Sequence, residues 1–95
     1  MDDLEQLRQK INKIDEKMIE LFEERMKTVC SIAEYKERHS MQVLDEKREK
    51  EVIARNLAKL KNKSIKVETE YFLNQVMYVS RMLQGEIIQK KDKEV

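Results

Sequence analysis

One apolar seam runs through the first third of the chain and limits what this chain can fold into. Its members follow one another at alternating steps of three and four residues: Leu4, Leu7, Ile11, Ile14, Met18 and Leu21. This spacing predicts a helix with an apolar stripe along its whole length. No Gly or Pro interrupts residues 4–36, and good helix formers dominate them, so intrinsic propensity agrees with the periodicity.

The predicted first helix is too long for a small domain to cover. Residues 4–36 would form a rod of roughly 50 Å, whereas a compact chain of this size has a diameter near ~30 Å. We therefore expect a second copy of the chain to cover the exposed seam, most simply in a two-fold homodimer. The alternative is a helix that breaks near its middle, although the segment contains no typical breaker residue.

The composition favours an all-α fold in a single domain. The 95 residues are 41% charged and 5% aromatic, with one Gly and no Pro, so sheet-forming and turn residues are scarce. The net charge is +1 and the charges are interspersed, which argues against nucleic acid as a partner. No apolar run approaches the ~20 residues needed to span a membrane, and the acidic N-terminus does not resemble a signal peptide. We expect a cytoplasmic protein without membrane contacts.

Three helices account for the chain, with expected bounds of about 3–38, 45–61 and 68–89. Asp2 or Asp3 can cap the first helix, and Asp45 can cap the second. Ser40 is the best turn residue of the first connection, and a short polar segment forms the second. The tail 90–95 should fray.

Polar residues interrupt the apolar seams of the first and third helices. Arg25 and Lys36 stand in the first seam, eleven residues apart, and therefore lie within about 20° of one helical face. Their long side chains can converge on a small anion. Ser80 and Gln84 interrupt the third seam one turn apart, and a buried Gln without a partner costs about 1–3 kcal/mol, so we expect the fold to supply one.

Three further charged residues each allow two interpretations. Arg8 precedes Arg25 by about 25 Å along the helix and lies about 100° round it, so it cannot reach the same pocket in its own chain. It serves either the partner's site or only the solvent. Arg48 and Glu49 open the second helix, where they either face a ligand or form an ordinary charged first turn.

Taken together, the polar intrusions indicate an anionic ligand. Arg and Lys are rarely buried without a partner, and two cations face the core with one obvious carboxylate nearby. A small molecule with two carboxylates matches this charge count.

The same residues carry a resemblance to a known family over the range from about Leu4 to Gln84. In order, the pattern is Leu7-Arg8-x-x-Ile11-x-x-Ile14-Asp15, Leu21-x-x-x-Arg25, Lys36, Asp45-x-x-Arg48-Glu49 and Ser80-x-x-x-Gln84. Each element is common, but their order and spacing together are specific. The chain resembles the all-helical AroQ-class chorismate mutases.

The resemblance implies a fold, a reaction and a set of site residues. The fold would be an intertwined homodimer of three-helix chains. The reaction would be the Claisen rearrangement of chorismate to prephenate in phenylalanine and tyrosine biosynthesis, without cofactor or metal. Arg25, and Arg8 from the other subunit, would bind the substrate carboxylates, while Lys36 and Gln84 would hydrogen-bond the ether oxygen. Glu49 and the backbone at Asp45 would bind the ring hydroxyl. Arg48 and Ser80 would line the pocket.

Two other readings of the sequence stay open. The same scaffold could act as an isochorismate-pyruvate lyase or an aminodeoxychorismate mutase, although a carboxylate at Glu49 favours a substrate with a hydroxyl. A non-catalytic helical dimerisation module would also show apolar seams. That alternative leaves the inward positions of Arg25, Lys36, Ser80 and Gln84 unexplained.

Overall fold

The computed structural model of the chain describes residues 2–93, with side chains described as far as residue 89. Within that range it contains three α-helices, one short 3-10 helix and no strand. The elements are α1 (Asp3–Arg38), α2 (Glu46–Lys59), η1 (Lys63–Ile65) and α3 (Lys66–Lys93). The predicted all-α fold with a very long first helix is confirmed.

Helix α1 is continuous, so the alternative of a break near its middle is wrong. Its N-terminus is capped by Asp2, whose carboxylate accepts a hydrogen bond of 2.7 Å from the backbone nitrogen of Glu5. The chain as a whole is elongated, with a radius of gyration of 17.1 Å and extents of 58 × 28 × 14 Å. A compact chain of this length would have a radius of gyration of about 12 Å.

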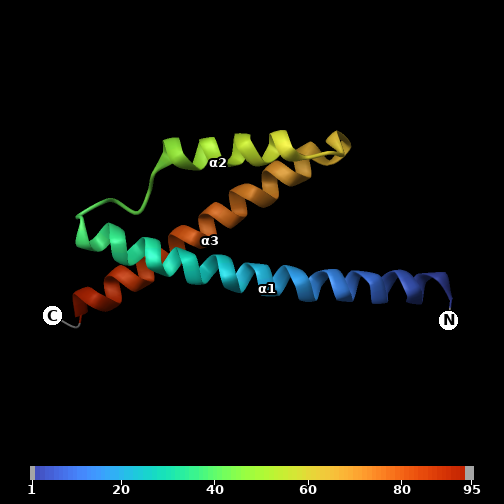
Figure 1. Cartoon of the computed structure of the whole chain (residues 1–95), viewed down its shortest axis with the longest axis horizontal. Coiled ribbons are helices and arrows are strands. Elements are labelled where there is room, and N and C mark those ends of the chain that lie inside the picture. The colour runs from blue at the N-terminus through green and yellow to red at the C-terminus, as the bar shows by residue number, and fades with distance from the viewer. Residues whose placement is uncertain (1, 94–95) are drawn as a thin grey trace.

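Helix α3 holds the molecule together. It crosses both other helices and packs against each of them, whereas the N-terminal half of α1 extends away from this crossing (Figure 1). The buried apolar residues Val29 and Ala33 on α1 and Met77 on α3 form a small core. Ala33 is completely buried, because its single methyl group lets the two helices approach closely.

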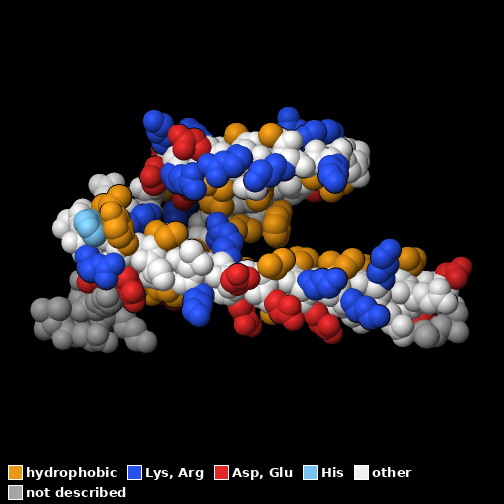
Figure 2. All heavy atoms as spheres, in the orientation of Figure 1, with side chains coloured by type: hydrophobic (Ala, Val, Ile, Leu, Met, Phe, Trp, Pro, Cys, Tyr) orange, Lys and Arg blue, Asp and Glu red, His pale blue; other side chains and the backbone are white. Residues whose placement is uncertain are grey.

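The apolar seam of α1 is not covered by the chain itself. The side chains of its first half are 48–65% exposed along the seam: Leu4, Leu7, Ile11, Ile14, Met18 and Leu21. Hydrophobic side chains gather along the edge of α1 that faces α2 and again beneath α2, where α3 crosses, with a hollow between them (Figure 2). None of the described helices is both long and apolar enough to cross a membrane.

The connections differ from the expected bounds at three points. Asp45 caps α2 as predicted, since its carboxylate accepts a 3.0 Å hydrogen bond from the Arg48 backbone nitrogen, but α2 ends at Lys59. Asn62 then caps the unforeseen η1 by accepting from the Ser64 backbone nitrogen at 3.1 Å, so α3 begins already at Lys66.

Helix α3 continues through residues 90–93, which lie within the tail that we expected to fray; residues 94–95 lie outside the described range. The sequence offers no Gly or Pro to stop the helix there. Basic residues at a helix C-terminus are also favourable for the helix dipole.

Candidate active site

The face of α1 that packs against α3 carries a cation at each end. Arg25, Val29, Ala33 and Lys36 follow one another at steps of four, four and three residues, so they share one face of the helix. Val29 and Ala33 are buried, while Arg25 and Lys36 are partly buried on either side of them. The structure therefore confirms that both seam cations face inward.

Arg25 contacts α3 through Ser80. Its Nη1 donates a hydrogen bond to the Ser80 hydroxyl, and that hydroxyl donates in turn to the carbonyl oxygen of Val76 at 2.7 Å. Burial lowers the pKa of Arg25 from its ordinary value, because the guanidinium loses hydration. A hydroxyl supplies no negative charge, so the positive charge of Arg25 is not neutralised by this contact.

Lys36 also has a neutral partner. Its Nζ donates a hydrogen bond of 2.8 Å to the backbone carbonyl of Val43, in the connection between α1 and α2. Among the side chains that the structure describes, as far as residue 89, no carboxylate is found within ion-pair distance of Arg25 or Lys36. Two partly desolvated cations therefore lie on one helical face with neutral hydrogen-bond partners.

Gln84 lies one turn after Ser80 on α3 and is 7% exposed. We expected the fold to give its amide a partner, and this expectation is wrong. Within the described residues, the buried Oε1 of Gln84 makes no hydrogen bond. Because an unmet buried polar group costs about 1–3 kcal/mol, the amide is available to a bound molecule that can pair with it.

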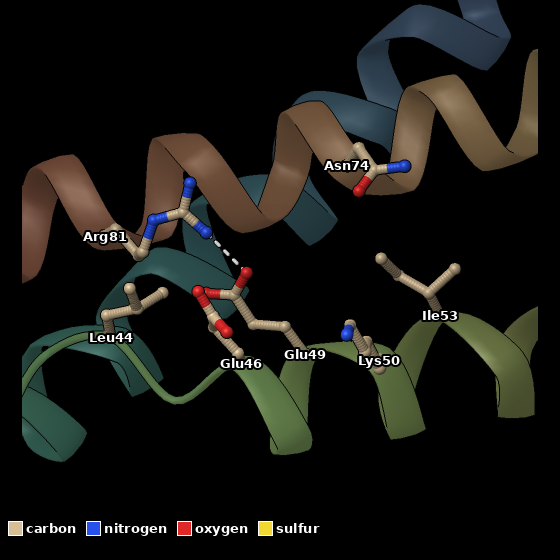
Figure 3. Close-up of a pocket in the computed structure, with 7 residues that line it drawn as sticks. All are labelled: Leu44, Glu46, Glu49, Lys50, Ile53, Asn74 and Arg81. Atoms are coloured by element: carbon tan, nitrogen blue, oxygen red, sulfur yellow. Dashed lines mark hydrogen bonds and ion pairs between the residues drawn. The ribbon is translucent and has the colours of Figure 1, made fainter.

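Glu49 reaches across from α2 to α3. It forms an ion pair with Arg81, and both residues line a cavity of about 390 Å³ between the two helices (Figure 3). The interpretation of Glu49 as part of an ordinary charged first turn, with local ion pairs only, is therefore wrong. The other residues that line this cavity are Leu44, Glu46, Lys50, Ile53 and Asn74.

The apolar pattern does not single out Arg81, although the sequence contains a signal for it. Arg81 follows Ser80 directly and does not stand in the apolar seam itself. It also lies four residues after Met77 and three before Gln84, and both of those neighbours are buried. Residues at these spacings share a surface of the helix, so Arg81 belongs to the same side of α3.

Three of the predicted site residues do not join the others within one chain. The others, here called the site cluster, are Arg25, Lys36, Glu49, Ser80 and Gln84. The Asp45 carboxylate is occupied in capping α2. The side chains of Arg48 and Arg8 are exposed and make no hydrogen bond or ion pair with other described residues. Because α1 is unbroken, Arg8 lies about 25 Å along the axis from Arg25.

A second hollow lies where α1 leaves the helix crossing. Its volume is about 630 Å³ and its lining is mostly apolar, with Met18, Leu21 and Phe22 from α1 opposite Val52 from α2 and Phe72 from α3. Arg25 lies at its edge. Isolated soluble chains rarely leave an apolar groove of this kind exposed to solvent.

Comparison with known proteins agrees with the geometry. The family model described as chorismate mutase type II matches residues 7–85, which includes every predicted site residue from Arg8 to Gln84. No significant match was found among curated proteins or among solved structures. The family consists of all-helical isomerases that act on chorismate. This chain therefore belongs to the type II chorismate mutases.

Proposed function

We propose that the protein converts chorismate to prephenate by a Claisen rearrangement, as a step of phenylalanine and tyrosine biosynthesis in the cytoplasm. The observation that carries this proposal is the pairing of Arg25 and Lys36 with neutral oxygens only. Chorismate is a dianion, so its two carboxylates can supply the charge that the described residues lack. The family match supports an enzyme over a non-catalytic dimerisation module.

The working form is an intertwined homodimer in which residues 1–95 form one domain of each subunit. The exposed seam of α1 and the adjoining apolar groove support this assignment, since both need a covering surface. The seam of a second copy, related by a two-fold axis, supplies a surface of the same length and character. Arg8 of one subunit then enters the site of the other, which its own chain cannot achieve.

Charged side chains bind the substrate at both of its ends. Arg25 and the Arg8 of the partner subunit clamp the two carboxylates, with Lys36 and Ser80 close to them. Glu49 and the backbone at Asp45 receive the ring hydroxyl, and Arg48 closes the pocket. Charge-assisted hydrogen bonds at both carboxylates hold the flexible substrate in the folded conformation that reacts.

The reaction itself requires no acid, base or nucleophile. One carbon–oxygen bond breaks while one carbon–carbon bond forms, and negative charge grows on the ether oxygen in the transition state. Lys36 and the Gln84 amide donate hydrogen bonds to that atom. Donors that are already in position stabilise the transition state more than the ground state, and the burial of Gln84 one turn after Ser80 supports its assignment as one of them, through Nε2.

The test is turnover of chorismate by the purified protein, followed by loss of its ultraviolet absorbance with identification of the product. Prephenate as the product supports the proposal. Release of pyruvate from isochorismate, without conversion of chorismate, would assign the lyase reaction to the same scaffold. A folded dimer that converts neither substrate would overturn the proposed reaction.

A further inference from the structure

Glu49 and Arg81 join α2 to α3, and Arg81 directly follows Ser80 of the proposed substrate site. Arg81 Nη1 donates to Glu49 Oε1, and the two side chains are 32% and 21% exposed. The guanidinium carbon of Arg81 also lies 5.8 Å from the centroid of the Tyr78 ring, within the range of a cation–π contact. Figure 3 shows Arg81 extending from α3 toward the Glu49 carboxylate.

The ion pair changes what Glu49 can recognise. One carboxylate oxygen is occupied by Arg81, so the other oxygen remains as an acceptor for a hydrogen bond. The guanidinium cancels most of the negative charge of Glu49 at that point. Two further charged residues line the same cavity, Glu46 and Lys50, but both are exposed, of opposite sign and screened by solvent.

We infer that Arg81 is a specificity-determining residue, which makes the site accept a neutral hydroxyl at the ring position next to Glu49 and reject an ammonium there. This inference rests on the proposed function, in which Glu49 receives the ring hydroxyl of the substrate. A hydroxyl needs only the free acceptor oxygen. An ammonium at the same position needs a net negative charge, and it would instead lie close to the positive charge of Arg81.

The experiment compares kcat/KM for chorismate with kcat/KM for its amino analogue, in which an ammonium replaces the ring hydroxyl. The readout is the ratio of the two values, which loss of folded protein does not change. Wild type should favour chorismate. Arg81→Met, which removes the charge but keeps an unbranched side chain, should shift the ratio about tenfold toward the amino analogue.

Three further variants serve as controls. Arg81→Lys retains a positive charge at this position and should keep the wild-type ratio within about twofold. Glu49→Gln removes the negative charge and leaves Arg81, so its ratio should shift in the opposite direction from that of Arg81→Met. Arg55→Met removes an exposed charge from α2, outside the cavity lining, and should leave the ratio unchanged.

The outcomes separate this inference from the proposed function. If wild type converts chorismate but Arg81→Met shows the wild-type ratio, the inference is wrong and the proposed reaction stands. An equal shift in Arg81→Lys and Arg81→Met would also contradict it, because the effect would then not come from charge. If wild type converts neither substrate, the proposed function fails and the inference fails with it.

Discussion

The Arg25 guanidinium donates a hydrogen bond to the hydroxyl of Ser80, which lies 55 positions later in the chain. This contact fixes the position of the cation between α1 and α3 without neutralising it. The cation therefore remains available to an anionic ligand, at a cost in stability to the protein without ligand. The contact therefore holds Arg25 in a position that favours ligand binding and lowers the stability of the protein without ligand.

We predict that Arg25→Met stabilises the protein without ligand, by on the order of 1 kcal/mol, because it removes a partly desolvated charge that has no anionic partner. The pKa of Arg25 is lowered by burial, but an arginine stays protonated throughout the neutral range, so the gain should not vary with pH there. Urea denaturation without ligand measures this difference.

The same variant should lose its response to ligand. A dicarboxylate transition-state analogue should raise the melting temperature of wild type, since it binds the folded state only. The analogue should raise the melting temperature of Arg25→Met much less. A variant that is less stable than wild type, or that responds equally to the analogue, would contradict the assignment of Arg25 to substrate binding.

Lys36→Ala should reduce kcat for chorismate by a factor of about 10²–10³, as commonly found when one oxyanion donor is removed, with little change in the fold. Steady-state kinetics and circular dichroism measure the two effects. Lys27→Ala is a matched control, because Lys27 is an exposed lysine of the same helix. An equal loss in both variants would indicate a general effect of charge rather than a catalytic role of Lys36.

Gln84→Glu should make activity depend on pH, with activity falling as the pH rises. A carboxyl at this buried position has a raised pKa and donates a hydrogen bond only while it is protonated. Above that pKa, the carboxylate repels the negative charge that develops on the ether oxygen. Wild type carries a neutral amide and should show no such decline between about pH 6 and 8. Superimposable pH profiles for the two proteins would exclude Gln84 from contact with this oxygen.

Much of the fold could be predicted from the sequence, because its helices are long and strongly periodic. The spacing from Leu4 to Leu21 and the absence of breakers predicted a continuous α1, and the caps at Asp2 and Asp45 were found where expected. The later bounds were less accurate. Asn62 caps a 3-10 turn that leads directly into α3, and such a local hydrogen bond leaves little trace in the apolar pattern.

The candidate site was predictable only in part, because helical periodicity gives the face of a residue but not its partner. It placed Arg25, Lys36, Ser80 and Gln84 inward, and the structure agrees. It could not show that Arg25 pairs with Ser80, since that contact depends on how α1 and α3 cross. The ion pair between Glu49 and Arg81 likewise depends on the crossing of α2 and α3.

Ile11→Lys should dissociate the proposed dimer and abolish its activity. Ile11 is 57% exposed in the single chain, at the middle of the uncovered seam, so a charge there would have to be buried against the partner. Sedimentation equilibrium measures the association. Lys13→Glu also changes a charge on α1 but lies about 200° round the helix from Ile11, and it should remain dimeric. A dimeric Ile11→Lys protein would mean that the seam is not the interface.

The most direct test of a site shared between two chains is subunit complementation. Arg8→Ala and Lys36→Ala are each expected to be inactive as homodimers. When the two are co-refolded in equal amounts, half of the dimers should be mixed, and each mixed dimer should contain one intact site and one with both substitutions. We predict recovery of about a quarter of the wild-type rate of chorismate conversion. A mixture that forms mixed dimers but shows no more activity than its inactive components would contradict a shared site.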